Sequence, residues 1–180
     1  NFAHNVQLSH HLMTLLKDAP TLRRVVFASS YLIYDPGLYL FNQPQKHAVR
    51  LKETDAVRPR NLTGVAKLAH ETELQFLANH AMGRFTSVSA RIFRGYGRGS
   101  RDVVSRWVRS ALAGERLVVY QPEGMFDYVY AGDIAEGLLR LAESPHVKGV
   151  VNLGTGQATK VQEVLAAVLA EIPAAGVEQT

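Results

Sequence analysis

Two groups of polar side chains in this sequence have types and an order that could support chemistry on a bound ligand. The first is Ser29-Ser30, which ends a short β-branched run, and the second is the segment from Thr63 to Lys67. Hydroxyl groups can hydrogen-bond a reacting oxygen, and an ammonium can lower the pKa of a neighbour by its charge. Ligands of open α/β sheets lie outside the carboxyl ends of the strands, so Ser30 is well placed. The alternatives are that the serines only satisfy backbone groups and that Lys67 is solvated.

Alternating helices and strands must position these residues. Residues 5–18 have apolar positions at helical spacing and stop at Pro20, while residues 24–29 are typical of a strand buried on both faces. Residues 35–60 predict a long loop and residues 62–81 a long helix. The remaining pattern predicts a strand over 88–93, a helix over 103–113, a strand over 117–120, a helix over 133–142 capped by Asp133, a strand over 149–153 and a helix over 161–170.

This alternation predicts an α/β fold with a doubly wound parallel sheet. A length of 180 residues with 47% hydrophobic residues fits one ordinary domain with a real core. The tail after Pro173 has no periodic pattern, and we expect it to be loosely ordered.

Composition narrows the class of partner. The net charge of +4 is scattered along the chain, which suits phosphate-bearing small molecules and does not favour nucleic acid. The absence of cysteine excludes a disulfide framework and a thiolate nucleophile, and the seven histidines lack paired ligand spacing, so we expect no metal site. No apolar run approaches the ~18 residues needed to cross a bilayer. We therefore expect no membrane partner and a cytoplasmic location.

Several further motifs occur in a consistent order along the chain. They are Asn5-Val6, Ile33-Tyr34, Glu53 and Pro59, Glu71 after Lys67, Arg91-Ile92-Phe93 followed by Gly95-Tyr96-Gly97, Asp127 with Asp133, and Asn152 to Gly156. With these motifs the stretch from Asn1 to the region of Ala170 resembles the extended short-chain dehydrogenase/reductase family, the NAD(P)-dependent nucleotide-sugar epimerases and dehydratases. The resemblance implies a Rossmann-like sheet, NAD or NADP as cofactor, and a nucleotide-sugar-like substrate. Residues 1–172 would then be the C-terminal part of the cofactor domain with elements of a substrate-binding lobe, and residues 173–180 a tail.

The resemblance also implies roles for individual residues. Ser30 and Lys67, with Thr63 at the position of the family's general base, would form the catalytic group. Lys67 would also bind the nicotinamide ribose of the cofactor, with Ser29 beside it. The residues implied on the substrate side are Arg94, Tyr96 and Asp127.

Three residues depart from the family pattern. Thr63 stands where relatives have the catalytic tyrosine, and an alkyl hydroxyl titrates far above a phenol with its pKa of ~10, so Thr63 is a poor general base. Tyr31 is a candidate replacement phenol. Arg94 replaces an asparagine common in relatives, and Phe126 replaces an arginine that would bind a diphosphate. A catalytically silent binding or interaction domain is therefore the alternative to an active enzyme.

The glycine-rich phosphate loop of the family is not found in these 180 residues. Gly95 to Gly99 gives G-x-G-x-G, which is not the dinucleotide spacing. We expect an N-terminal piece of ~30 or more residues to precede Asn1, because a βαβ unit needs that length. We also expect a homodimer through helices 5–18 and 62–81, whose apolar arcs are wide; the alternative is that these arcs are buried within one domain.

Overall fold

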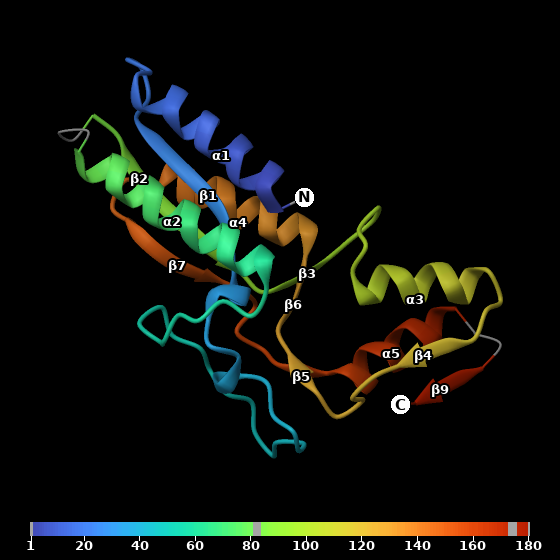
Figure 1. Cartoon of the computed structure of the whole chain (residues 1–180). Coiled ribbons are helices and arrows are strands. Elements are labelled where there is room, and N and C mark those ends of the chain that lie inside the picture. Colours follow the sequence, from blue (N-terminus) through green and yellow to red (C-terminus); the bar gives the residue numbers. More distant parts are fainter. Residues whose placement is uncertain (1, 81–83, 173–175, 180) are drawn as a thin grey trace. The chain divides into compact units, whose positions relative to one another are not determined.

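The chain folds into two compact units in a computed structural model that describes residues 2–80, 84–172 and 176–179 (Figure 1). Unit 1 comprises Asn1–Leu40, Arg50–Ile92 and Ala135–Leu153, and unit 2 comprises Phe41–Val49, Phe93–Ile134 and Gly154–Thr180. Unit 1 contains Ser30, Thr63 and Lys67, whereas unit 2 contains the residues implied on the substrate side.

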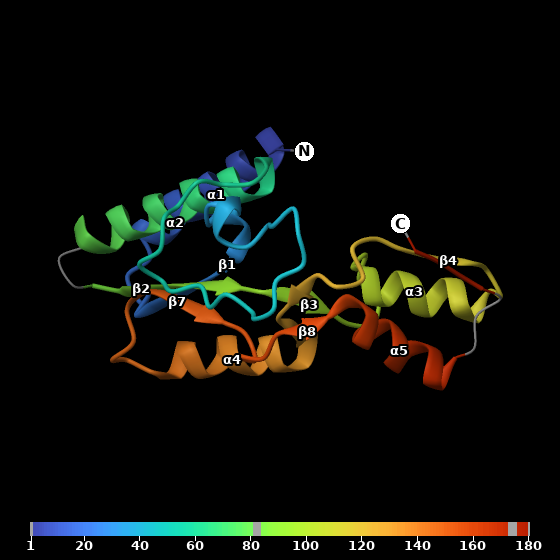
Figure 2. The same ribbon diagram turned by 90° about the horizontal axis from the view of Figure 1, so that it is seen from below.

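Unit 1 is built on a parallel three-stranded sheet in the order β1-β2-β7. The strands are β1 (Arg24–Ser30), β2 (Thr86–Ile92) and β7 (Gly149–Leu153). Helices α1 (Phe2–Lys17) and α2 (Leu62–His80) cover one face, and α4 (Ala131–Glu143) covers the other (Figure 2). This arrangement confirms the predicted α/β fold with a doubly wound parallel sheet.

The register of unit 1 brings the carboxyl ends of its strands to one edge. Ser29 pairs with Arg91, and Arg91 pairs in turn with Asn152. The 3-10 helices η1 (Tyr31–Ile33) and η2 (Pro36–Leu38) follow directly from β1. Ser30 therefore lies at the carboxyl end of β1, where the turn formed by η1 and η2 begins.

Two kinds of contact hold the layers of unit 1 together. The apolar core between sheet and helices is centred on Met13, Leu74 and Phe85. On the other face, the Arg24 guanidinium donates to Leu141 O (2.6 Å) and Val147 O (2.7 Å), which fixes the end of α4 and the chain after it to the start of β1. Arg24 also satisfies carbonyls that a helix end leaves unpaired.

The described residues of unit 2 form helices α3 (Val103–Leu112) and α5 (Val161–Glu171), the start of α4 and short strand pairs. The helices α3 and α5 enclose a core with β4. β3 (Arg94–Tyr96) pairs with β6 (Tyr128–Tyr130), β4 (Leu117–Val119) with β9 (Val177–Gln179), and β5 (Met125–Phe126) with β8 (Thr159–Lys160). The buried members of the core are Trp107, Leu117, Val119, Val161, Leu165 and Val168.

The structure corrects two predictions at element ends. The tail after Pro173 is not loosely ordered throughout, because residues 177–179 form β9 on the edge of β4; residues 173–175 and 180 lie outside the described residues. Asp133 is not an N-cap, because α4 begins at Ala131 directly after β6, and Asp133 lies in the first turn. A carboxylate there still favours the helix dipole.

The apolar arcs of the first two helices divide into buried and exposed sides. Met13 and Leu74 are buried, whereas Leu8, Leu12 and Leu15 of α1 are more than half exposed, at 59%, 55% and 73%. Phe76 of α2 is 58% exposed. Within the described residues no helix is both long and apolar enough to cross a bilayer.

Candidate functional site

Lys67 is fixed against β1 rather than solvated. Its Nζ donates to Ala28 O (2.7 Å) and lies 5.0 Å from the centre of the Phe27 ring. Burial lowers the pKa of this ammonium. An ammonium can donate three hydrogen bonds, and the structure gives this one a single acceptor among the described residues. Lys67 therefore brings its amino group, with hydrogen-bond donors to spare, to the carboxyl half of β1.

Ser29 and Ser30 differ in how their hydroxyls are used. Ser30 Oγ accepts the backbone N–H of Leu32 (3.2 Å) and so caps η1. Ser29 is 3% exposed, and its Oγ has no hydrogen-bond partner among the described residues. Buried hydroxyls are nearly always paired, so an unpartnered one calls for an explanation.

Thr63 lies in the first turn of α2 with its side chain exposed. The start of this helix approaches η1 closely, because a Cβ on Gly64 would lie 2.5 Å from Leu32 O. The N–H of Gly64 donates to Asn61 Oδ1 (2.9 Å), which caps the helix, and the N–H of Arg60 donates to Leu32 O (3.0 Å). The segment of Thr63 therefore lies beside the turn that follows Ser30.

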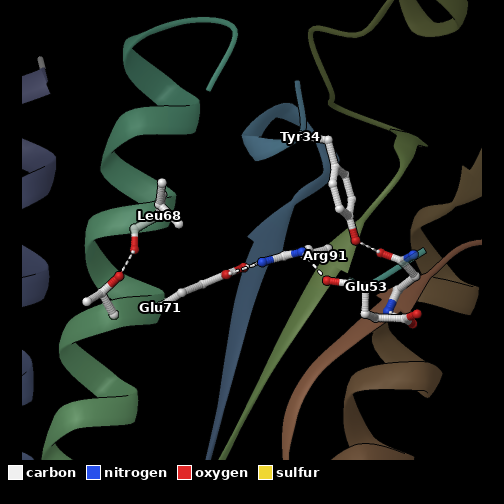
Figure 3. Close-up of polar contacts among 7 residues, drawn as sticks. Tyr34, Glu53, Leu68, Glu71 and Arg91 are labelled. Carbon is white, nitrogen blue, oxygen red and sulfur yellow. Dashed lines mark hydrogen bonds and ion pairs between the residues drawn. The ribbon is translucent and has the colours of Figure 1, made fainter. Parts of the chain in front are cut away.

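A buried ion pair lies between α2 and the sheet (Figure 3). Arg91 donates to Glu71 through Nε (3.2 Å) and Nη2 (2.9 Å), and both side chains are 6% exposed. Arg91 Nη1 also donates to Glu53 O (3.2 Å). Burial opposes the charge of Arg91, but the hydrogen bonds to Glu71 raise its pKa above the ordinary value. Arg91 is thus a fixed cation that joins a strand, a helix and a loop.

The same loop is tied to β7 and to η1. Tyr34 Oη donates to Asn152 Oδ1 (2.7 Å), and Asn152 Nδ2 donates to Leu51 O (3.0 Å). The backbone N–H of Asn152 donates to Glu53 Oε1 (2.8 Å). Arg91 lies 4.7 Å from the centre of the Tyr34 ring, and burial raises the pKa of this phenol.

A pair of tyrosines follows Ser30. The Tyr31 and Tyr39 rings meet edge to face with centroids 5.5 Å apart. The Tyr39 hydroxyl is buried and has no hydrogen-bond partner among the described residues. Burial, and then the neighbouring Tyr31, raise the pKa of Tyr39, so this phenol stays protonated.

In unit 2, the Asp127 carboxylate is hydrogen-bonded to the turn at residues 154–156. Its carboxylate accepts from the Thr155 N–H (3.0 Å), the Thr155 hydroxyl (2.7 Å) and the Gly156 N–H (2.9 Å). A Cβ on Gly154 would lie 2.5 Å from Asp127 Oδ2, so this glycine and the carboxylate are in close contact. Most of the hydrogen-bonding capacity of Asp127 is used inside the protein.

Arg94 and Phe126, two of the residues that depart from the family pattern, are in contact. The Arg94 guanidinium lies 3.8 Å from the centre of the Phe126 ring and 5.7 Å from that of Tyr128, and its Nη1 is 3.4 Å from Tyr128 Oη. Tyr96 contacts Tyr130 with ring centroids 5.8 Å apart. A cation therefore lies over residue 126 although the residue itself is not basic.

Comparison with known proteins assigns the chain to a family. The model of the NAD dependent epimerase/dehydratase family matches residues 1–154. The chain belongs to this family. The match confirms the resemblance to nucleotide-sugar epimerases and dehydratases that the motifs indicate.

Individual relatives of the epimerase/dehydratase family have low identity and high structural similarity. The chain is 25% identical over 119 residues to dTDP-4-dehydro-6-deoxyglucose reductase of Escherichia coli, covering 63% of this chain and 37% of that protein. It matches Thermus thermophilus UDP-glucose 4-epimerase in complex with NAD at 27% identity and a TM-score of 0.79, covering 97% of this chain and 56% of that one. UDP-N-acetylglucosamine 4-epimerase from Methanobrevibacter ruminantium M1, in complex with UDP-N-acetylmuramic acid, has 23% identity and a TM-score of 0.80, with 98% and 55% covered. The chain thus spans little more than half the length of these structures.

Sequence reasoning missed how Arg91 is used in this member of the epimerase/dehydratase family. Arg91 and Glu71 both belong to the motifs that carry the resemblance, but the motifs did not predict their pairing or the link to Glu53. A signal was present, since an arginine within the apolar strand 88–93 needs a buried partner. The roles of Ser29, Ser30, Thr63, Lys67, Arg94, Tyr96 and Asp127 stay predictions.

Proposed function

We propose that this chain forms part of an NAD- or NADP-dependent enzyme that epimerises or dehydrates a nucleotide sugar, with Ser30 and Lys67 at the reacting centre. The observation that carries the proposal is the hydrogen bond from Lys67 Nζ to Ala28 O, which holds the lysine against the carboxyl half of β1, two residues before Ser30. Ligands of open α/β sheets bind at this edge.

The residues of unit 1 fit a nicotinamide cofactor. Lys67 retains donors suited to ribose hydroxyls, and the Ser29 hydroxyl is buried without a partner among the described residues. When bound, the cofactor would accept a hydride from a sugar carbon and return it. Ser30 Oγ accepts from Leu32, so its own hydrogen is left to donate to the reacting oxygen of the sugar.

The residues of unit 2 support an anionic substrate. Arg94 places a guanidinium over Phe126, and guanidinium groups bind diphosphates through paired hydrogen bonds. We propose that Arg94 binds the substrate diphosphate in place of an arginine at position 126. Tyr96 would contribute ring surface to the same ligand, whereas Asp127 would act by holding the turn at Gly154.

The test uses the protein that carries this chain. We expect it to bind NAD or NADP in calorimetry and to convert one member of a UDP-sugar panel, with both properties weakened by Lys67→Ala and retained by the exposed control Lys148→Ala. Absence of cofactor binding by the unmodified protein would refute the proposed function.

The second candidate is a catalytically silent binding domain, and Thr63 favours it. Loss of a general base costs a rate factor of about 10² to 10⁴. If a phenol at position 63 is all that an otherwise intact site lacks, Thr63→Tyr raises turnover by about that factor. If Tyr31 has replaced it, Tyr31→Phe abolishes turnover instead. A protein that binds cofactor but gains nothing from Thr63→Tyr and loses nothing with Tyr31→Phe supports the silent domain.

We also propose that the protein is a homodimer through α1 and α2. The exposed stripe Leu8, Leu12 and Leu15 supports this proposal, because adjacent exposed leucines cost solvation free energy unless a partner covers them. Light scattering should give a dimer mass that Leu12→Glu halves. The matched control is Leu139→Glu on α4, where the leucine is 61% exposed.

A further inference from the structure

Arg91 contacts three segments of unit 1: α2, which carries Lys67, the loop at Glu53, and the turn that follows Ser30. The guanidinium contacts α2 through Glu71, the loop through Glu53, and the turn after β1 through the ring of Tyr34 (Figure 3). We infer that Arg91 is a positioning residue that holds Lys67 and Ser30 in their places at the end of β1. The inference rests on the proposed function for its meaning, but its structural test is independent of turnover.

Stability alone gives a poor account of this ion pair. Both partners are 6% exposed, and taking two charges out of water costs about as much as their attraction returns. Replacement of a buried ion pair by apolar side chains of similar volume is often neutral or stabilising. A directional role is a better explanation, because a guanidinium has several donors in fixed directions.

The hydrogen bonds from Arg91 to Glu71 fix α2. Glu71 is one turn after Lys67 on the same helix, so the two side chains lie on neighbouring positions of one face. Two hydrogen bonds from Arg91 to the Glu71 carboxylate restrain the rotation of α2 above the sheet. That rotation determines whether Lys67 Nζ reaches Ala28 O.

The hydrogen bond from Arg91 to the Glu53 carbonyl fixes the loop at Glu53 and, through it, the turn after Ser30. Arg91 Nη1 holds the carbonyl of Glu53, whose carboxylate accepts the Asn152 N–H. Asn152 in turn accepts from Tyr34, and the N–H of Tyr34 donates to Tyr31 O to close η1. Ser30 caps this same short helix. Each segment is therefore connected to Arg91 by hydrogen bonds.

The experiment compares the double variant Glu71→Met/Arg91→Met with Glu136→Met/Arg140→Met, which removes an exposed ion pair on α4. Urea unfolding first establishes that both proteins are folded. Lysines are then reductively methylated with ¹³C, and the NMR signal of Lys67 is assigned by its absence in Lys67→Arg. Hydrogen exchange of residues 31–38 and 51–60 is measured on the same proteins.

We expect the Glu71/Arg91 double variant to fold but to hold Lys67 and residues 31–38 and 51–60 less firmly. The Lys67 signal should titrate like those of exposed lysines, and amides of 31–38 and 51–60 should exchange about tenfold faster. The α4 control should change neither. A folded double variant with unchanged Lys67 titration and unchanged exchange would show that Arg91 is only structural and would overturn the inference.

A third variant covers the case in which the double variant does not fold. Arg91→Lys keeps the charge opposite Glu71, but a single ammonium cannot reproduce the fork that also reaches Glu53. Faster exchange of residues 51–60 in folded Arg91→Lys supports the inference, and unchanged exchange contradicts it. Failure of the unmodified protein to bind NAD would refute the proposed function while leaving these comparisons to decide the role of Arg91.

Discussion

The two units use their charged side chains in different ways. In unit 1, Arg91 and Glu71 are buried together, while Lys67 and Ser29 keep hydrogen-bonding capacity that the described residues do not use. In unit 2, Asp127 uses its carboxylate to hold a turn, and Arg94 lies against aromatic rings. Unit 1 thus combines a buried ion pair with hydrogen-bonding groups that the described residues leave unused. In unit 2, by contrast, the charged side chains named here bind to neighbouring groups of the same unit.

This difference indicates where the sequence could change without loss of the fold. Position 63 is exposed at the start of α2, so the residue type there can change without disturbing a core. In unit 2, the arginine at 94 contacts the phenylalanine at 126, so the two departures compensate in charge. A change at position 63 therefore leaves the packing of unit 1 intact, whereas residues 94 and 126 of unit 2 depend on each other through their contact.

The largest effect should come from breaking the buried support of unit 1. Glu71→Met alone leaves Arg91 charged and unpaired, which should lower the free energy of unfolding by about 3–5 kcal/mol. Asp127→Asn keeps an acceptor for the turn of unit 2 and should cost about 1 kcal/mol. Urea unfolding followed by far-UV circular dichroism measures both, and fluorescence of Trp107, the single tryptophan, reports on unit 2. Equal losses would contradict the contrast between the units.

The sequence predicted long elements better than contacts between them. Helix 62–81 and strand 149–153 have clear periodicity and match α2 and β7, with residue 81 outside the described residues. Strand 177–179 is too short to show a pattern, and it forms because the edge of β4 is available. The order of Ser30, Thr63 and Lys67 predicted a site at the end of β1, and the roles of these residues stay predictions. The Arg91–Glu53 contact joins residues far apart in sequence and needs the tertiary fold.

A second prediction concerns the approach of backbone to backbone in unit 1. Gly64→Ala places a Cβ 2.5 Å from Leu32 O and should cost about 1–3 kcal/mol, because a backbone carbonyl cannot rotate away. Gly154→Ala in unit 2 meets the side chain of Asp127 at the same 2.5 Å. That carboxylate can rotate, so the loss should be smaller. Thermal unfolding of the two variants tests the order, and a larger loss for Gly154→Ala would contradict it.

The pH dependence of stability should also differ between the units. His70 of unit 1 is 3% exposed, and its Nδ1 lies 3.9 Å from Glu73 Oε2. Burial lowers the pKa of this imidazole below 6.5, although Glu73 raises it. The unfolded chain then binds a proton that the folded chain resists, so stability falls as pH drops through 6.5.

We expect this group to lower the free energy of unfolding as the pH falls from 7 to 5.5. His70→Phe should remove that component of the pH dependence, whereas His47→Gln, at an exposed position in unit 2, should leave it unchanged. Urea unfolding across this pH range is the measurement. An unaltered pH dependence in His70→Phe would mean that another group is responsible.

The smallest stability effect should come from Arg94, and it separates packing from ligand binding in unit 2. The contact of its guanidinium with Phe126 is a cation–π interaction, which contributes about 0.5–1 kcal/mol when partly solvated. Arg94→Met should therefore lower the free energy of unfolding by no more than about 1 kcal/mol.

If Arg94 binds the diphosphate of the substrate, the same variant should weaken calorimetric binding of UDP by about tenfold or more, because a charge-assisted contact contributes more to binding than to folding here. Arg98→Met, at an exposed neighbouring position, controls for general loss of positive charge. Equal weakening of UDP binding by both variants would reduce Arg94 to one charge among several, whereas a selective loss would make residue 94, rather than 126, the diphosphate contact of this chain.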